Sequence, residues 1–323
     1  IKDREHEAFA YQYHLIDLLR IGKFTFAENM AQRWENYKYT FNTRTFLLNN
    51  GLYIAIALVF IALCAITPVV KGTQLTAQNV LNIFQQASPR MFLALGVAGL
   101  ILQTGTDLSI GRMVGMSMVA STIIMHAGPN TGTVFGIAFD FSTMPLVAQI
   151  ILALVVCVVL CTAFSAIAGF FTAKFKMHWF ISTMANMLII FGLVTYATKG
   201  VSFGSINPLI PAMVTPRIGG FPTIILWAVA AIVVVWFIWN KTTFGKNLFA
   251  VGGNPEAARL SGIPSKNVLT FVYSLSGFMA GMAGVVSVGR LASANGNAGS
   301  TYDTDAIAAC IIGGASFTGG KGT

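Results

Sequence analysis

A single acidic residue, Asp107, lies deep within the apolar part of the sequence, between two hydrophobic segments. A buried carboxylate is costly in such surroundings, so it is a functional candidate by default. Asp107 also precedes a predicted helix, where a carboxylate accepts hydrogen bonds from free N–H groups and meets the positive end of the helix dipole. We favour this capping role. Arg112 follows one turn later and could pair with Asp107 or face a cavity.

Three further polar residues, Ser182, Thr183 and Asn186, lie inside a segment long and apolar enough to cross a membrane. Their side chains could donate hydrogen bonds to a polar solute, or they could link neighbouring helices. We favour the linking role. Ser182 and Asn186 nevertheless join Asp107 and Arg112 as candidates for lining a translocation path.

The residue types that enzymes combine are not brought together by this sequence. The histidines lie in the N-terminal segment or at the ends of apolar runs, and no set of Ser, His and Asp or pair of carboxylates lies within a span. Cys157 and Cys161 are four residues apart, but without a nearby His or acid we interpret them as small buried hydrophobes. We therefore expect no enzyme activity, no metal site and no cofactor.

The glycine-rich end of the chain is similar to a phosphate-binding loop but departs from it. That motif requires Gly five residues before the Gly that precedes its Lys, and Ser or Thr directly after the Lys. The corresponding positions here are Ala315 and Gly322, and no strand precedes them. We expect that the chain does not bind ATP.

A loop between two spans, residues 240–267, predicts a short and well-defined helix. Asn254 is a good N-cap, Pro255 a good first residue, and Gly262 a good C-terminal stop. The helix itself would comprise Glu256, Ala257, Ala258, Arg259 and Leu260. It could dock a cytoplasmic partner or be an incidental turn of the loop, and physical reasoning alone leaves both open.

The elements that must position these residues are membrane helices. Hydrophobic residues make up 55% of the chain and charged residues 10%, and the mean hydropathy is +0.71, whereas soluble domains carry roughly 25% charged residues. The fold class is therefore an all-α, polytopic helical bundle. The net charge of +9 could indicate nucleic acid, but the basic residues lie in loops between apolar runs, as they do in membrane proteins. We expect no nucleic acid partner.

Apolar runs predict seven full or broken crossings and one half-helix, with the second crossing broken by polar residues and Pro89. The predicted crossings are residues 51–70, 80–102, 108–125, 146–173, 180–198, 221–239 and 268–288, and the half-helix is residues 306–314.

Lys and Arg in the loops place the N-terminus in the cytoplasm. Residues 1–48 are expected to form a cytoplasmic extension with an amphipathic helix, carried by Phe9, Tyr13, Ile16 and Leu19. This helix could lie on the membrane or on a partner, or it could be an exposed cytoplasmic helix, and both readings stay open. Residues 49–323 would form the transmembrane domain.

Three stretches of the sequence resemble one known family. They are residues 94–112, residues 240–262, and residues 289–320 with their run Tyr302-Asp-Thr-Asp-Ala-Ile-Ala-Ala-Cys310. The resemblance is to permease subunits of bacterial ATP-binding cassette sugar importers of the ribose and galactose type. The forms at residues 106–112 and 305–310 are most similar to the galactose/methyl-galactoside branch. The resemblance covers residues 49–323, and it implies further spans after Thr323 and leaves residues 1–44 as an extension.

The resemblance implies a permease that moves galactose, glucose or a methyl-galactoside across the bacterial inner membrane. It also implies the partners: a cytoplasmic ABC ATPase that hydrolyses ATP, a periplasmic sugar-binding protein, a second permease copy and membrane lipid. Residues Asn254 to Gly262 would be the coupling helix, with Glu256 and Arg259 contacting the ATPase. A same-family permease for ribose, a nucleoside or another small solute is the alternative, and a channel or secondary transporter is a more distant one.

Overall fold

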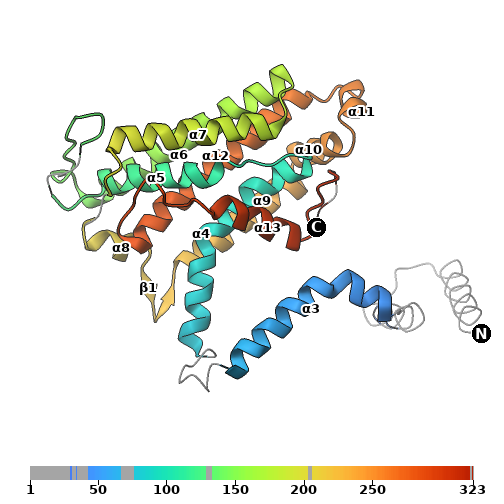
Figure 1. Ribbon diagram of the computed structural model, residues 1–323, viewed down its shortest axis with the longest axis horizontal. Helices are drawn as coiled ribbons and strands as arrows, with labels where there is room; N and C mark the ends of the chain where they lie inside the picture. The colour runs from blue at the N-terminus through green and yellow to red at the C-terminus, as the bar shows by residue number, and fades with distance from the viewer. Residues whose placement is uncertain are drawn as a thin grey trace, which may run out of the picture. The chain divides into compact units, whose positions relative to one another are not determined.

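A computed structural model describes residues 30, 34, 43–66, 76–128, 133–202, 206–320 and 322. The chain forms two compact units, residues 1–75 and 76–323. In the first unit the described helix is α3 (Thr43–Ile66), an apolar helix whose large side chains are mostly exposed (Figure 1). The amphipathic positions expected between Phe9 and Leu19 lie outside the described residues.

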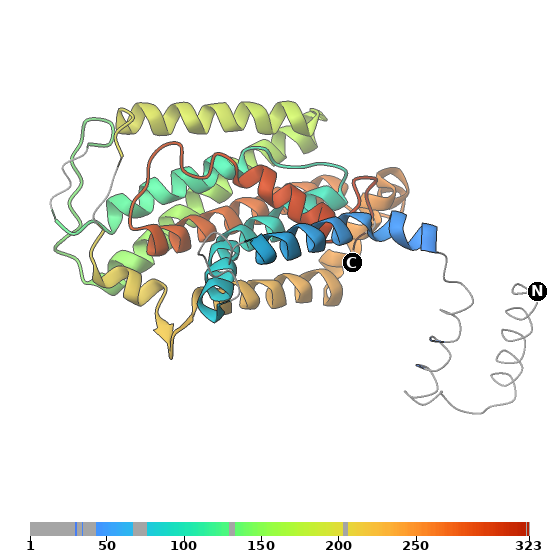
Figure 2. The same cartoon turned by 60° about the horizontal axis from the view of Figure 1, so that its bottom comes forward.

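The second unit is a bundle of helices with one two-stranded hairpin (Figures 1 and 2). Its elements are α4 (Ala77–Leu102), α5 (Ile110–Ile124), α6 (Leu146–Phe175), α7 (Trp179–Thr198), α8 (Leu209–Val214), β1 (Arg217–Ile218), β2 (Phe221–Pro222), α9 (Ile224–Lys241), α10 (Thr243–Gly253), α11 (Pro255–Leu260), α12 (Ser265–Leu291) and α13 (Tyr302–Ile312). The predicted all-α fold class is confirmed.

Helix α12 is the centre of the second unit. It packs on α4, α5 and α6, and 72% of its most apolar stretch is buried, against 17–33% for the spans α6, α7 and α9. These four helices are the ones in the described part of the chain that have the length and hydropathy to cross a membrane. Protein therefore surrounds α12, whereas much of the surface of α6, α7 and α9 would face lipid.

Small residues, Gly277 and Gly281 among them, allow α6 and α12 to approach closely. A Cβ atom at Gly277 would overlap the carbonyl oxygen of Cys161, and one at Gly281 would lie 2.7 Å from the Cα of Val158. Helix α6 presents a single buried stripe to this contact: Gln149, Ala153, Cys157, Cys161, Ser165, Ala168, Gly169 and Ala173. The expectation that Cys157 and Cys161 are buried packing residues is confirmed.

The second crossing is not broken where the sequence suggested. Helix α4 runs continuously through Pro89 and changes direction along its length in Figure 1. A proline removes one helical hydrogen bond and bends the helix without ending it when neighbours hold both halves. The chain leaves helical geometry later, at residues 103–109, between α4 and α5.

Helix α5 is shorter than the predicted crossing at residues 108–125. Its 15 residues rise about 22 Å, less than the ~30 Å hydrocarbon layer. Thirteen of them are buried, so α5 is enclosed by protein. The predicted half-helix is α13, with 11 residues.

The glycine-rich end is a packing junction. Gly319 and Gly320 have φ angles of 79° and 63°, and the Gly320 N–H donates to the Leu102 carbonyl at 2.9 Å. A Cβ atom at Gly252 would overlap that carbonyl. The end of α4, the end of α10 and the segment after α13 therefore meet backbone to backbone.

Candidate functional site

Asp107 is fully buried at the centre of a polar network in the segment that joins α4 and α5. Its Oδ1 atom accepts from the N–H and the hydroxyl of Ser109, at 2.9 and 2.5 Å. Its Oδ2 atom lies 3.3 Å from the hydroxyl of Ser165 on α6 and from that of Ser276 on α12. Three segments distant in the sequence thus converge on one carboxylate.

The network extends to α7 and to the backbone of α12. Asn186 donates to the Ser109 hydroxyl at 2.9 Å, and the Ser165 hydroxyl lies 2.6 Å from the carbonyl oxygen of Tyr273. Because each oxygen of Asp107 has partners and no exposed surface, this network holds the interruption between α4 and α5 in place.

The capping role favoured for Asp107 is not the one that the structure shows. Ser109 occupies the N-cap position of α5, and its side chain makes no capping hydrogen bond. Asp107 instead accepts the N–H two residues later, in a local Asx-type turn. The N-terminus of α5 is packed against other segments and is not a free helix end. The Asp107 carboxylate therefore bonds to residues of neighbouring helices and does not cap α5.

The four residues expected to line a translocation path, Asp107, Arg112, Ser182 and Asn186, lie in different surroundings. Asp107 and Asn186 meet through Ser109, whereas Ser182 on α7 donates to the Ala168 carbonyl of α6 at 2.8 Å. Ser182 and Asn186 therefore link helices. Thr183, which lies beside them, bonds to Trp179 within its own helix.

Arg112 belongs to a second group of polar residues. Its guanidinium donates to the Asn297 side chain at 3.0 Å and lies 4.4 Å above the centre of the Phe191 ring. The structure thus gives Arg112 partners other than Asp107, and it lies partly exposed.

Helix α11 is built as the sequence predicts. The Asn254 side chain accepts from the N–H groups of Glu256 and Ala257, at 3.1 and 3.0 Å, and Pro255 is the first helical residue. At the other end, Gly262 has a φ of 82°. The N–H groups of Gly262 and Ile263 then return to the carbonyls of Arg259 and Ala258, each at 3.0 Å, which is a Schellman stop.

One face of α11 is anchored and the other is free. Ala258 is 4% exposed, whereas Leu260 is 81% exposed. Glu256 and Arg259 form an ion pair of 3.0 Å with exposed side chains, so the pair adds little stability. An exposed leucine beside an exposed ion pair, on a helix capped at both ends, is a surface suited to contact with another protein.

A hydrophobic cluster connects α11 with the polar network. It contains Leu100, Leu102, Leu248, Val251, Ala258, Val268, Val272 and Tyr273. Gln103 adds a hydrogen bond of 2.9 Å to the carbonyl of Leu248 in α10. Because Tyr273 also meets Ser165, packed atoms lead without interruption from the exposed helix to the residues around Asp107.

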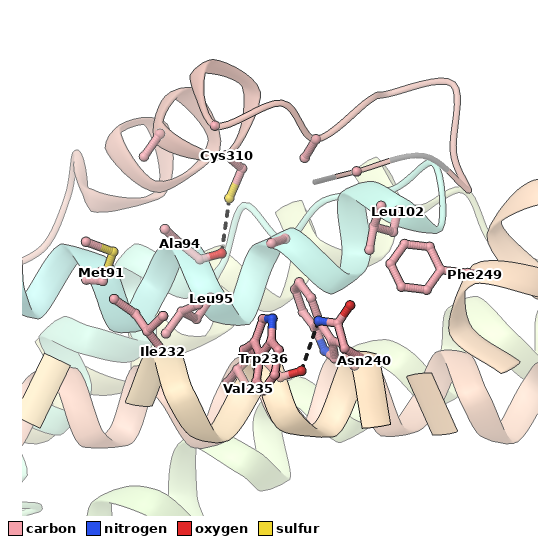
Figure 3. Close-up of a pocket in the computed structure, with 16 residues that line it drawn as sticks. Met91, Ala94, Leu95, Leu102, Ile232, Val235, Trp236, Asn240, Phe249 and Cys310 are labelled. Atoms are coloured by element: carbon pink, nitrogen blue, oxygen red, sulfur yellow. Dashed lines mark hydrogen bonds between the residues drawn. The ribbon is translucent and has the colours of Figure 1, made fainter. Parts of the chain in front are cut away.

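Sequence reasoning missed a pocket of about 500 Å³ between α4, α9, α10 and α13 (Figure 3). Its lining is mostly apolar and includes Met91, Leu95, Trp236 and Phe249. Cys310 reaches across it from α13 to the Ala94 carbonyl, at 3.1 Å. No spacing in the sequence brings four separate helices to one pocket, so only tertiary packing could reveal it.

An ion pair between α4 and α13 was also missed. The Arg90 guanidinium lies 2.7 Å from the Asp305 carboxylate and 4.6 Å from the centre of the Tyr302 ring. The sequence signal was present, because Arg90 and Asp305 are rare charges in apolar runs. Because 215 residues separate them, the sequence does not show that these two residues pair.

Comparison with known proteins adds the following findings. A family model described as a branched-chain amino acid transport system / permease component matches residues 79–320. The galactose/methyl galactoside import permease protein MglC of Treponema pallidum is 43% identical over 332 residues, covering 99% of this chain and 62% of the relative. The chain therefore spans less than two thirds of that relative.

Two shorter relatives are also similar. The MglC protein of Escherichia coli K12 is 38% identical over 286 residues, covering 86% of this chain and 82% of the relative. The ribose import permease protein RbsC of Haemophilus influenzae is 31% identical, covering 89% and 83%. No solved structure matches.

Proposed function

The chain belongs to the permease family whose model it matches over residues 79–320, and we propose that it is the membrane-spanning subunit of an ATP-binding cassette importer. Its cargo would be a monosaccharide of the galactose, glucose or methyl-galactoside type, carried across the bacterial inner membrane. Relatives named as galactose/methyl galactoside permeases, at 43% and 38% identity, support this cargo.

The observation that carries the proposal is the construction of α11. It is capped by Asn254, stopped by Gly262 and anchored through Ala258, yet it exposes Leu260 and the pair Glu256–Arg259. In the proposed mechanism this coupling helix sits in a groove of a cytoplasmic ATPase. Movement of the ATPase is then transmitted through the cluster around Tyr273 to the helices near Asp107.

The same proposal specifies the other partners. ATP hydrolysis would take place in the separate ATPase, a periplasmic binding protein would deliver the sugar, and a second permease copy would complete the path. The N-terminus and α11 would both face the cytoplasm, because the basic loops lie on that side.

Ribose is the second candidate cargo, since the chain is 31% identical to a ribose import permease. The higher identity to the galactose relatives favours a hexose. A channel or secondary transporter would need no stoichiometric ATPase.

The test is purification of the tagged permease from its native host, followed by assay in lipid discs. We expect an ATPase to co-purify in a fixed ratio, and galactose-loaded binding protein to stimulate it. The double variant Arg259→Glu with Ala257→Trp should abolish both effects, because it reverses a charge and adds bulk on the exposed face of α11.

Arg217→Glu is the matched control. It makes the same charge change at an exposed residue of β1, which lies at the opposite end of the second unit from α11 in Figure 1. Unchanged stimulation in the α11 double variant would contradict the docking role. Absence of any co-purifying ATPase from the natural chain would contradict the importer itself.

A further inference from the structure

Five polar residues in and near the half-helix α13 make two sets of contacts that the proposed coupling mechanism does not use. We call these residues together the α13 rim: Arg90, Arg112, Asn297, Tyr302 and Asp305. Arg90 of α4 contacts α13 itself, and Arg112 of α5 contacts the loop that precedes α13. Its contacts are the Arg90–Asp305 ion pair, the Arg90–Tyr302 ring contact and the Arg112–Asn297 hydrogen bond.

The Arg90 part of the α13 rim lies near the middle of the bundle. Arg90 directly follows Pro89 in the 26-residue helix α4. A Cβ atom at Gly96, less than two turns away, would lie 3.1 Å from the Cα of Ser276. Ser276 is in turn close to the midpoint of α12, one of the membrane spans.

Charges at that depth are not left facing lipid. The side chains of Arg90 and Asp305 are 37% and 45% exposed in the single chain. Exposing either one to hydrocarbon costs several kcal/mol, so ionisable residues at this depth face water-filled cavities or other protein. The exposed side of the α13 rim therefore borders an aqueous space, another subunit or the further spans that the resemblance implies after Thr323.

The chemistry of the α13 rim suits a polyhydroxylated solute. A carboxylate accepts hydrogen bonds from sugar hydroxyls, guanidinium groups donate to hydroxyl and ring oxygens, and the Asn297 amide can do either. Arg90 lies over one face of the Tyr302 ring, and the other face would be the apolar surface for sugar C–H groups. A few converging polar groups beside aromatic surface are typical of small-molecule sites.

Resting on the proposed function, we propose that the α13 rim is a sugar-contacting station of the translocation path, at which Arg90 and Asp305 engage hydroxyl groups of the hexose. Asp107 and Asn186 then hold the surrounding helices in position and do not contact the sugar, since they are buried and bonded to protein. Among the four path residues expected from the sequence, Arg112 is the one that belongs to this station.

The test uses the complete permease with its ATPase and binding protein in proteoliposomes. Uptake is measured at saturating loaded binding protein, with galactose and its deoxy analogues, and ATP hydrolysis is recorded in parallel. Arg90→Gln and Asp305→Asn should slow galactose uptake at least tenfold while stimulated ATPase stays within twofold. The ATP hydrolysed per sugar would rise accordingly, and discrimination against at least one deoxy analogue would be lost.

A charge-swapped variant separates this role from a structural clamp. Arg90→Asp with Asp305→Arg keeps the attraction between α4 and α13, so the thermal stability should return to that of the natural chain. Uptake should stay slow, because donor and acceptor have exchanged places.

Tyr302→Leu, which keeps the ion pair, should slow uptake several-fold. Asp140→Asn makes the same change as Asp305→Asn but in an exposed loop, so it should leave uptake unchanged.

Recovery of normal uptake by the swapped pair would overturn the proposal, and so would single variants that keep both the rate and the analogue preference. In either case the natural complex still imports hexose, so the proposed function stands. Failure of the natural complex to import any hexose would instead overturn the proposed function.

Discussion

At the scale of single residues, Asp107 shows how a membrane protein keeps a carboxylate in its interior. The acid accepts hydrogen bonds from Ser109 and lies against the hydroxyls of Ser165 and Ser276. A fully satisfied polar group fixes one arrangement of three segments, whereas a partly satisfied one would destabilise all of them.

Asp107→Ala should therefore lower the thermal stability of the purified protein. The change leaves buried hydrogen-bond donors without an acceptor, and each such donor costs about 1–3 kcal/mol of stability. Asp107→Asn should keep much of the stability, because its amide oxygen can accept from Ser109 and the serine hydroxyls can rotate to accept from its amide nitrogen. Thermal melting in detergent measures the difference, with Ser276→Ala as the control that removes one partner only. Natural stability in the Ala variant would show that the network does not hold the fold.

At the scale of elements, the contact between α6 and α12 depends on the absence of side-chain atoms. In lipid the packing of small residues is a main source of helix association. Gly277 lies so close to Cys161 that no Cβ atom fits without separating the helices. The central position of α12 follows from this, because a helix with larger residues could not be enclosed so tightly.

Gly277→Ala should lower the melting temperature, since α6 and α12 would have to move apart. Gly192→Ala is the matched control, because a Cβ atom at Gly192 in α7 meets nothing within 4 Å. At such a site alanine is favoured over glycine by up to about 1 kcal/mol. The control should therefore melt at the same temperature or higher. Equal losses in both variants would mean that helix propensity, and not packing, sets the stability.

The caps of α11 carry a separate prediction. Asn254→Ala removes the acceptor for two N–H groups and should cost about 1 kcal/mol locally. Because six residues form the helix, that loss should loosen α11 without melting the bundle. We expect lower stimulation of the ATPase by loaded binding protein at an unchanged melting temperature. Asn254→Asp keeps the acceptor and should restore stimulation, and identical behaviour of Ala and Asp would contradict the capping argument.

At the scale of the whole molecule, the chain divides into two compact units, and the family model lies within the second. The Treponema relative aligns with 99% of the chain, whereas the Escherichia coli relative aligns with 86%.

Deletion of residues 1–48 should leave the second unit folded. Its core clusters are drawn from residues after Thr76, so the melting temperature should change little. Comparative melting of the truncated and full chains measures this, with size-exclusion chromatography as the check on aggregation. A large fall in melting temperature would show that the extension supports the bundle, and the predicted domain boundary would be wrong.

The sequence by itself determined the features that depend on neighbouring residues. The membrane class follows from apolar runs, and α11 follows from Asn254, Pro255 and Gly262, because caps act within a few residues of themselves. The four-residue spacing of Gly277 and Gly281 also places both on one face of a helix, which permits close packing.

Only the tertiary structure decided which distant residues meet. It continued α4 through Pro89, moved the interruption to the segment around Asp107, and enclosed α5 within the bundle. It also paired Arg90 with Asp305 across 215 residues. The physical reason is that a buried charge requires a partner but does not specify where in the sequence that partner lies, so the packing of helices makes the choice.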